Sequence, residues 1–220
     1  GINIHYDRDD KLIWLEMSGQ GCRNFESYGH GDWLKLFDYI NQDDCNVTRI
    51  DIAIDDKEGI LKLKRLANDT LNQKYVSKFE FYDVRQSSKG ITIYHGSPQS
   101  DVRIRIYDKA LERGYDEATH WVRFEIQMRR KRAINYIRAV LNNGDIGYIT
   151  TGVINSYIRY IKLDNVRKTR CSTVAYWRNF ISHTDKISIF SKVGTEYNLH
   201  QLEEYVYKQC GNAIDTLYKI

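Results

Sequence analysis

The chain has 220 residues, 42% of them hydrophobic, and a single proline, which is typical of a folded protein that buries a sizeable core without long linkers. Lys and Arg number 33 against 29 Asp and Glu, so the net charge of +4 gives only weak support for a nucleic-acid partner. No apolar run approaches the roughly 18 residues that span a bilayer, and we expect no membrane segment.

Several common kinds of site are disfavoured by residue spacing. The four cysteines form no C-x-x-C pair, so reduced thiols in a cytoplasm are expected rather than a zinc knuckle. The six histidines form neither H-x-H nor H-E-x-x-H, which disfavours a metal site built from histidine. The chain also lacks a P-loop and a G-x-S-x-G motif, which argues against nucleotide-driven chemistry and against a serine hydrolase.

Hydrophobic periodicity predicts the elements in chain order. A period of two predicts strands at 2–6, 12–17, 49–55, 76–84, 91–95, 102–107 and 121–129, and a small strand at 187–190. A period of 3.6 predicts helices at 33–40, 60–71, 131–143, 146–163, 174–181 and 198–210. Asp32 is the predicted cap of the first helix. Residues 18–23 are predicted to form a glycine-containing loop, and 109–114 a short helix or loop.

This order of elements predicts an α+β fold, with a largely antiparallel sheet, helices on one face and a helical C-terminal region. We expect a sheet domain over 1–130, which would carry the catalytic site. A helical part over 131–220 would pack on the same domain or continue it.

Three of the predicted strands, 49–55, 102–107 and 122–129, have one apolar and one polar face. The polar positions gather three carboxylates, several arginines and a tyrosine. They are Arg49, Asp51, Asp55, Arg103, Arg105, Tyr107, Arg123, Glu125, Gln127 and Arg129. If the strands share a sheet, this second face is the candidate active site.

Carboxylate oxygens suit a hard divalent cation such as Mg²⁺ or Mn²⁺. Asp51 and Asp55 lie about 13 Å apart by strand rise, so they share one ion only if the strand bends. Asp51 with Glu125 is the simpler pair, and Asp55 is the third candidate ligand. The alternative is that the acids only neutralise nearby arginines, which are Arg49, Arg103 and Arg123.

Tyr107 follows two arginines on its strand face. A metal that polarises a phosphodiester would let its phenolate attack phosphorus and form a 5′-phosphotyrosine. Tyr82, Tyr94 and Tyr115 are nearby competitors, and any one of these tyrosines could instead be an ordinary residue of an amphipathic strand.

Three segments carry a resemblance to a known family. They are RIDIAIDD at 49–56, YHG at 94–96 continuing to SDVRIRIYDKALE at 100–112, and WVRFEIQ at 121–127. In this order and spacing they resemble the Rep_trans family, which includes replication initiators of staphylococcal-type rolling-circle plasmids and relaxases of integrative conjugative elements. The similarity is strongest from about 46 to 130, and residues 18–23 also resemble a family segment.

The resemblance implies a bacterial, cytoplasmic, site-specific enzyme that nicks DNA at an origin and transfers the strand. It implies a relaxase fold in which carboxylates replace the paired histidines of HUH endonucleases. Tyr107 would be the nucleophile, and Asp51, Glu125 and Asp55 would hold Mn²⁺ or Mg²⁺. Phosphate contacts are expected from Arg103, Arg105, Lys109 and Arg123.

Two rival functions stay open: a non-catalytic origin-binding protein, and a metal nuclease in which water attacks. Two basic clusters, residues 129–132 (the first basic cluster) and 167–170 (the second), would grip DNA or simply be solvated surface. The sequence leaves open whether the protein forms a homodimer and whether a helicase or other relaxosome proteins join it. The helix-turn-helix domain that conjugative members often carry is expected to be absent or to lie outside this sequence.

Overall fold

A computed structural model describes residues 1–7, 13–27, 31–43, 45–88, 90–116 and 118–184. These residues all fall in one compact unit, which spans Gly1–Ile189. The elements predicted at 187–190 and 198–210 lie outside the described residues.

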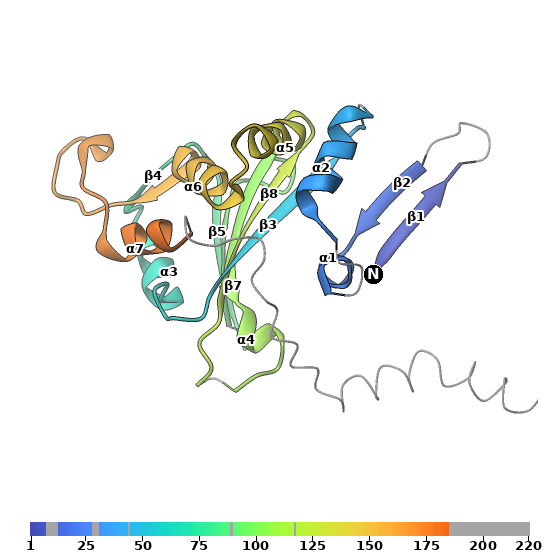
Figure 1. Ribbon diagram of the computed structural model, residues 1–220. Helices are drawn as coiled ribbons and strands as arrows, with labels where there is room; N and C mark the ends of the chain where they lie inside the picture. Colours follow the sequence, from blue (N-terminus) through green and yellow to red (C-terminus); the bar gives the residue numbers. More distant parts are fainter. Residues whose placement is uncertain (8–12, 28–30, 44, 89, 117, 185–220) are drawn as a thin grey trace, which may run out of the picture. The chain divides into compact units, whose positions relative to one another are not determined.

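The centre of the fold is a five-stranded antiparallel sheet with the order β3-β8-β7-β6-β5 (Figure 1). Its strands are β3 (Arg49–Asp56), β5 (Tyr82–Ser87), β6 (Gly90–His95), β7 (Val102–Asp108) and β8 (Val122–Arg129). The three strands with polar faces are therefore adjacent in one sheet, and the α+β class is confirmed.

Helices cover the apolar face of this sheet. They are α2 (Trp33–Gln42), α3 (Leu63–Leu71), α5 (Lys131–Asn143), α6 (Ile146–Tyr157) and α7 (Ala175–Thr184). Phe124 of β8 is fully buried, and its ring lies 6.1 Å from Trp177 and 5.3 Å from Phe180 of α7. Because these helices and the apolar sides of the strands share one core, the opposite side of the sheet is left to the polar residues.

Local signals explain where two of the helices begin or end. The Asp32 side chain accepts hydrogen bonds from the backbone N–H groups of Leu34 and Lys35, so the predicted cap of α2 is confirmed. Gly144 ends α5 in the left-handed region, with φ 76°, where glycine is favoured.

The loop predicted at 18–23 is wrong, because helix α1 (Gly19–Ser27) begins there. The Ser18 hydroxyl accepts a hydrogen bond from the Gly21 N–H and starts the helix. A Cβ atom on Gly21 would lie 2.3 Å from the Gly1 carbonyl oxygen. The glycine therefore allows the helix to approach the start of β1 (Ile2–Tyr6), which pairs antiparallel with β2 (Ile13–Met17).

Two long predicted elements are each divided in the structure. The strand predicted at 76–84 separates into β4 (Tyr75–Ser77) and β5, and the helix predicted at 146–163 ends at Tyr157, where β9 (Ile158–Tyr160) begins. Strands β4 and β9 pair in a small sheet of their own. Ile158 and Tyr160 are both fully buried in it, so long-range pairing outweighs the helical pattern of the local sequence.

The remaining elements are α4 (Lys109–Glu112), which is the short helix expected after β7, and a single 3₁₀ turn at Lys168–Arg170. Cys22, Cys45 and Cys171 are free thiols. Among the described helices, none has the length and apolar character needed to cross a membrane.

Candidate active site

Cross-strand register aligns the polar face in three rows. Tyr107 lies opposite Arg123, which lies opposite Asp55 on its other side. In the next row Arg105 lies opposite Glu125, and Glu125 lies opposite Ala53. The third row runs from Arg103 through Gln127 to Asp51. Successive rows lie two residues apart along each strand, because side chains alternate between the two faces of a sheet.

Tyr107 and Glu125 are joined by a hydrogen bond. The phenol hydroxyl donates to Oε1 of Glu125 at 2.8 Å, and the Arg105 guanidinium lies over the tyrosine ring, 4.1 Å from its centre. Although only 5% of Tyr107 is exposed, its hydroxyl therefore points along the polar face and not into the helical core. Burial, followed by the hydrogen bond and negative charge of Glu125, raises the pKa of Tyr107 above its usual value.

Each carboxylate on this face is paired with an arginine. Arg105 donates to Oε2 of Glu125 from Nε at 3.0 Å, and its Nη2 lies 2.7 Å from the same oxygen. Arg123 holds Asp55 through two parallel hydrogen bonds of 2.6 and 2.7 Å. Burial would raise the pKa of Asp55, but the hydrogen bonds and charge of Arg123 outweigh it and lower that pKa.

Asp51 is the most exposed of the three acids and is paired within its own strand. Arg49 donates to Oδ1 of Asp51 from Nε at 2.7 Å and also contacts Oδ2. The acids thus neutralise Arg49, Arg105 and Arg123, whereas the alternative drawn from the sequence paired them with Arg49, Arg103 and Arg123.

The chemistry of the three carboxylates fits a hard divalent cation, but their spacing does not fit one ion held by all three. Among the described residues, no group of three or more His, Cys, Asp or Glu side chains is close enough to hold a metal. Asp51 and Asp55 flank Ala53, so both lie diagonally across from Glu125, within reach of a long side chain. Mg²⁺ commonly binds through one or two carboxylates and takes its other ligands from phosphate and water. The geometry is therefore compatible with Glu125 and one neighbouring aspartate as ligands.

Lys109, an expected phosphate contact, lies at the start of α4 and is only 7% exposed. Its ammonium group pairs with Glu112 and lies 5.6 Å from the centre of the Tyr107 ring. Burial lowers the pKa of Lys109, and the neighbouring Glu112 opposes this effect. The lysine therefore packs beside the tyrosine instead of extending freely into solvent.

Two backbone features fix the end of β7 next to Tyr107. The Asp108 side chain accepts a hydrogen bond from the Leu111 N–H and caps α4, while the Lys109 N–H donates to the Trp121 carbonyl oxygen. The chain thus turns immediately after the tyrosine, and the turn is tied to the start of β8.

The three competing tyrosines differ in position from Tyr107. The ring of Tyr82 contacts Tyr75 at 6.3 Å, and Tyr115 lies outside the strands with 46% of its surface exposed. Tyr94 does share the polar face, opposite Arg105, and the guanidinium groups of Arg103 and Arg85 lie 4.3 and 5.3 Å from the centre of its ring. Alternation along 90–95 could have placed Tyr94 on this face. That the small residue Ala53 lies opposite Glu125 could be known only from the register between the strands.

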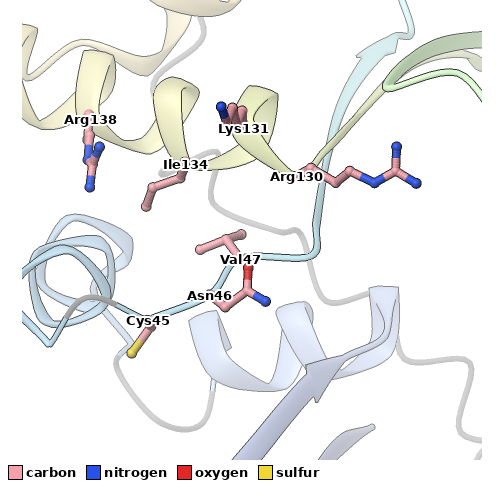
Figure 2. A pocket seen from close by; sticks show the side chains of 7 residues that line it. All are labelled: Cys45, Asn46, Val47, Arg130, Lys131, Ile134 and Arg138. Atoms are coloured by element: carbon pink, nitrogen blue, oxygen red, sulfur yellow. The ribbon is translucent and has the colours of Figure 1, made fainter.

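The first basic cluster lies where β8 ends and α5 begins. A shallow pocket of about 340 Å³ lies there, and its lining residues are Cys45, Asn46, Val47, Arg130, Lys131, Ile134 and Arg138 (Figure 2). Arg129 faces the same side of the sheet as Arg49, its partner in register, and donates to the Pro98 carbonyl oxygen. The second basic cluster lies beyond β9, where Lys168 donates to the Gln73 carbonyl oxygen.

Comparison with known proteins adds the family. The sequence profile of Rep_trans, described as replication initiation factor, matches residues 45–220. The chain belongs to the Rep_trans family.

Two relatives of this Rep_trans protein are informative. A protein of Bacillus subtilis (strain 168) named "Putative DNA relaxase NicK" is 30% identical over 210 residues, which cover 87% of this chain and 60% of the relative. The structure of a rolling circle replication initiator protein from Geobacillus stearothermophilus is 31% identical, with a TM-score of 0.74, over 86% of this chain and 75% of that chain. The Rep_trans protein therefore shares its fold with a known initiator, and it spans 60% of the length of the Bacillus relative.

Proposed function

We propose that this chain nicks DNA at an origin and becomes covalently joined to it through Tyr107, as a relaxase or rolling-circle replication initiator would. The observation that carries the proposal is the 2.8 Å hydrogen bond from the Tyr107 hydroxyl to Glu125, next to two arginines on an open sheet face. The names of the two relatives, a relaxase and an initiator, support the same class of reaction.

Glu125 is the group positioned to take the tyrosine proton. Because burial and Glu125 keep the phenol protonated at neutral pH, the nucleophile forms only as the O–H bond breaks during attack. The proton passes to Oε1 of Glu125 while the phenolic oxygen bonds to phosphorus. The bond from phosphorus to the 3′ oxygen breaks, and that oxygen takes a proton from solvent water and leaves as a free 3′-OH. The downstream strand remains on Tyr107 as a 5′-phosphotyrosine.

Arginines supply the positive charge that the transition state needs. The guanidinium group of Arg123 lies opposite Tyr107 and that of Arg105 lies in the next row, where both can stabilise charge on the phosphate oxygens. Arg103 extends this set by one row, and Lys109 adds charge beside the tyrosine ring.

A divalent cation, Mn²⁺ or Mg²⁺, would polarise the scissile phosphate and offset its charge. The Glu125 oxygen that does not face Tyr107 would hold it together with Asp51 or Asp55, and the small side chain of Ala53 opposite Glu125 leaves room for it. Cation binding would also release the carboxylate concerned from its arginine, which would then be free for the phosphate.

The deciding experiment uses DNA that carries the origin of the replicon encoding the protein. A single-stranded origin oligonucleotide labelled at its 3′ end is incubated with the protein and Mn²⁺, and the mixture is boiled in detergent. We expect a labelled protein–DNA species with the wild type and none with Tyr107→Phe, which keeps the ring and loses only the nucleophilic oxygen. Tyr115→Phe is the matched control and should react as the wild type does.

The two rival functions give different results in the same assay. A nuclease that uses water would cleave the oligonucleotide without any labelled protein. A non-catalytic origin-binding protein would retain the DNA on a filter but leave it intact, and Tyr107→Phe would change nothing. Either result would overturn the proposal.

A further inference from the structure

Two polar atoms on the polar face have no hydrogen-bond partner among the residues that the structure describes. They are Nε of Arg103 and Oε1 of Gln127, and both are hidden from solvent. The two residues lie directly opposite each other on β7 and β8. In the other two rows the arginines are engaged, since Arg105 binds Glu125 and Arg123 binds Asp55.

Leaving such groups unpaired costs free energy, because each has given up water without gaining a partner. Buried polar groups in folded proteins are nearly always satisfied, so a donor directly opposite an acceptor, neither of them engaged, forms a position at which a ligand can be recognised. That ligand must offer an acceptor to Arg103 and a donor to Gln127 at neighbouring positions. The edge of a nucleobase has this arrangement.

An aromatic ring lies next to this pair. The guanidinium of Arg103 lies 4.3 Å from the centre of the Tyr94 ring, and that of Arg85 lies 5.3 Å from it. Tyr94 is half-buried and shares the polar face with Arg105. Aromatic rings on an open sheet face are a common surface for stacking the bases of single-stranded nucleic acid.

We propose that Tyr94, Arg103 and Gln127 form a subsite for one purine base next to the scissile phosphate. Arg103 would donate to N7, which both purines carry, and the Gln127 amide would bind the group on C6. The base would stack on the ring of Tyr94. This subsite rests on the proposed function, because it describes how the nicked strand is recognised beside Tyr107.

The distances along the strand agree with a neighbouring nucleotide. Gln127 lies two residues beyond Glu125 on β8, about 7 Å by strand rise. A phosphate held at Glu125 and Tyr107 would therefore leave its adjoining nucleotide over the row of Arg103 and Gln127. Adenine fits the amide as it is oriented, and rotation of the amide by half a turn would fit guanine.

The test varies the base at each position flanking the nick. Origin oligonucleotides carrying A, G, C or T are compared by the rate at which the labelled protein–DNA species forms at low substrate concentration. We expect the wild type to favour purines at one flanking position by roughly ten- to a hundredfold. Gln127→Leu, which keeps the size and removes the amide, should reduce that preference to about threefold or less while the covalent species still forms.

Further variants separate recognition from folding. Gln127→Glu can only accept hydrogen bonds, so it should shift the preference toward adenine and cytosine, the bases with an exocyclic amine. Tyr94→Ala should raise KM by roughly tenfold or more, because a stacking contact is lost. The increase should be similar for the four oligonucleotides, because an aromatic ring stacks on any base. Gln86→Leu, at an exposed position on β5, is the matched control and should keep the wild-type preference.

The outcomes distinguish the subsite from the reaction itself. If no covalent species forms with any oligonucleotide, the proposed function fails. If the species forms but the wild type shows no base preference, or if Gln127→Leu and Gln127→Glu both keep the preference, the reaction stands and the subsite is wrong. Unequal effects of Tyr94→Ala on the four bases would exclude the stacking role.

Discussion

Ala53 is the smallest side chain among the row partners of the candidate site, and it lies exposed opposite Glu125 between Asp51 and Asp55. A longer side chain at this position would cover the Glu125 carboxylate and the Tyr107 hydroxyl bonded to it. Alternation in the sequence predicted which side chains share this face. It could not predict the pairing of Arg105 with Glu125 or the orientation of the phenol. Both depend on the register between β7 and β8, and the whole sheet fixes that register.

Ala53→Leu is therefore expected to block the reaction without unfolding the protein. Formation of the covalent species should fall by roughly a hundredfold, the loss that follows when a reacting group is displaced by about 1 Å. The melting temperature should change little, because an exposed strand position tolerates leucine. Ala53→Ser, which stays small, should react nearly as the wild type does. Undiminished activity of Ala53→Leu would show that substrate does not approach over Ala53.

Among the elements, the small sheet of β4 and β9 meets the large sheet at His95, the last residue of β6. His95 is fully buried, its Nε2 lies 3.0 Å from the Tyr160 hydroxyl, and its ring contacts Tyr75 at 5.0 Å. The sequence did not predict this contact, because residues 158–160 were assigned to the helix predicted at 146–163. Residues 158–160 alternate between core and surface only over three positions, too few for a strand pattern to be recognised within a helical one.

The buried histidine makes stability depend on pH. Burial lowers the pKa of His95 to about 3, from an ordinary value of 6.5. Between these values the unfolded chain binds a proton that the folded protein does not, so stability is complete above about pH 6.5 and decreases as the pH falls, by about 1.4 kcal/mol per pH unit.

Urea unfolding at pH 7 and pH 5 measures this effect. His95→Gln should lose about 2 kcal/mol less than the wild type between the two pH values, since one proton is taken up over about 1.5 units. His5→Gln, on the exposed strand β1, should lose as much as the wild type. Equal losses in the wild type and in His95→Gln would mean that His95 does not bind a proton on unfolding.

Over the whole described chain, positive charge is distributed unevenly with respect to the polar face. Arg129 of the first basic cluster lies opposite Arg49 and extends the polar face by one row, whereas the second basic cluster lies beyond β9. From the sequence, each cluster could grip DNA or be solvated surface, because a run of basic residues looks the same wherever it folds. Only the strand order distinguishes a cluster that adjoins the candidate site from one that does not.

Salt dependence of binding to single-stranded origin DNA should separate the two clusters. Replacing Arg129, Lys131 and Arg132 with alanine should reduce the slope of log K against log salt by up to about 2, since each lost phosphate contact on a single strand contributes roughly 0.7. The matched replacement of Arg167, Lys168 and Arg170 should leave the slope unchanged. The reverse result would place the DNA on the side of β9.

Tyr107 lies on β7, which is hydrogen-bonded to β6 on one side and to β8 on the other. If DNA is joined to this tyrosine, any tension from unwinding or displacing the strand acts on the middle of the sheet, not on a loop or an edge. The load would then be shared by two ladders of backbone hydrogen bonds, and the protein could be pulled along with its DNA without being unravelled. An attachment point on a flexible segment would offer no such resistance.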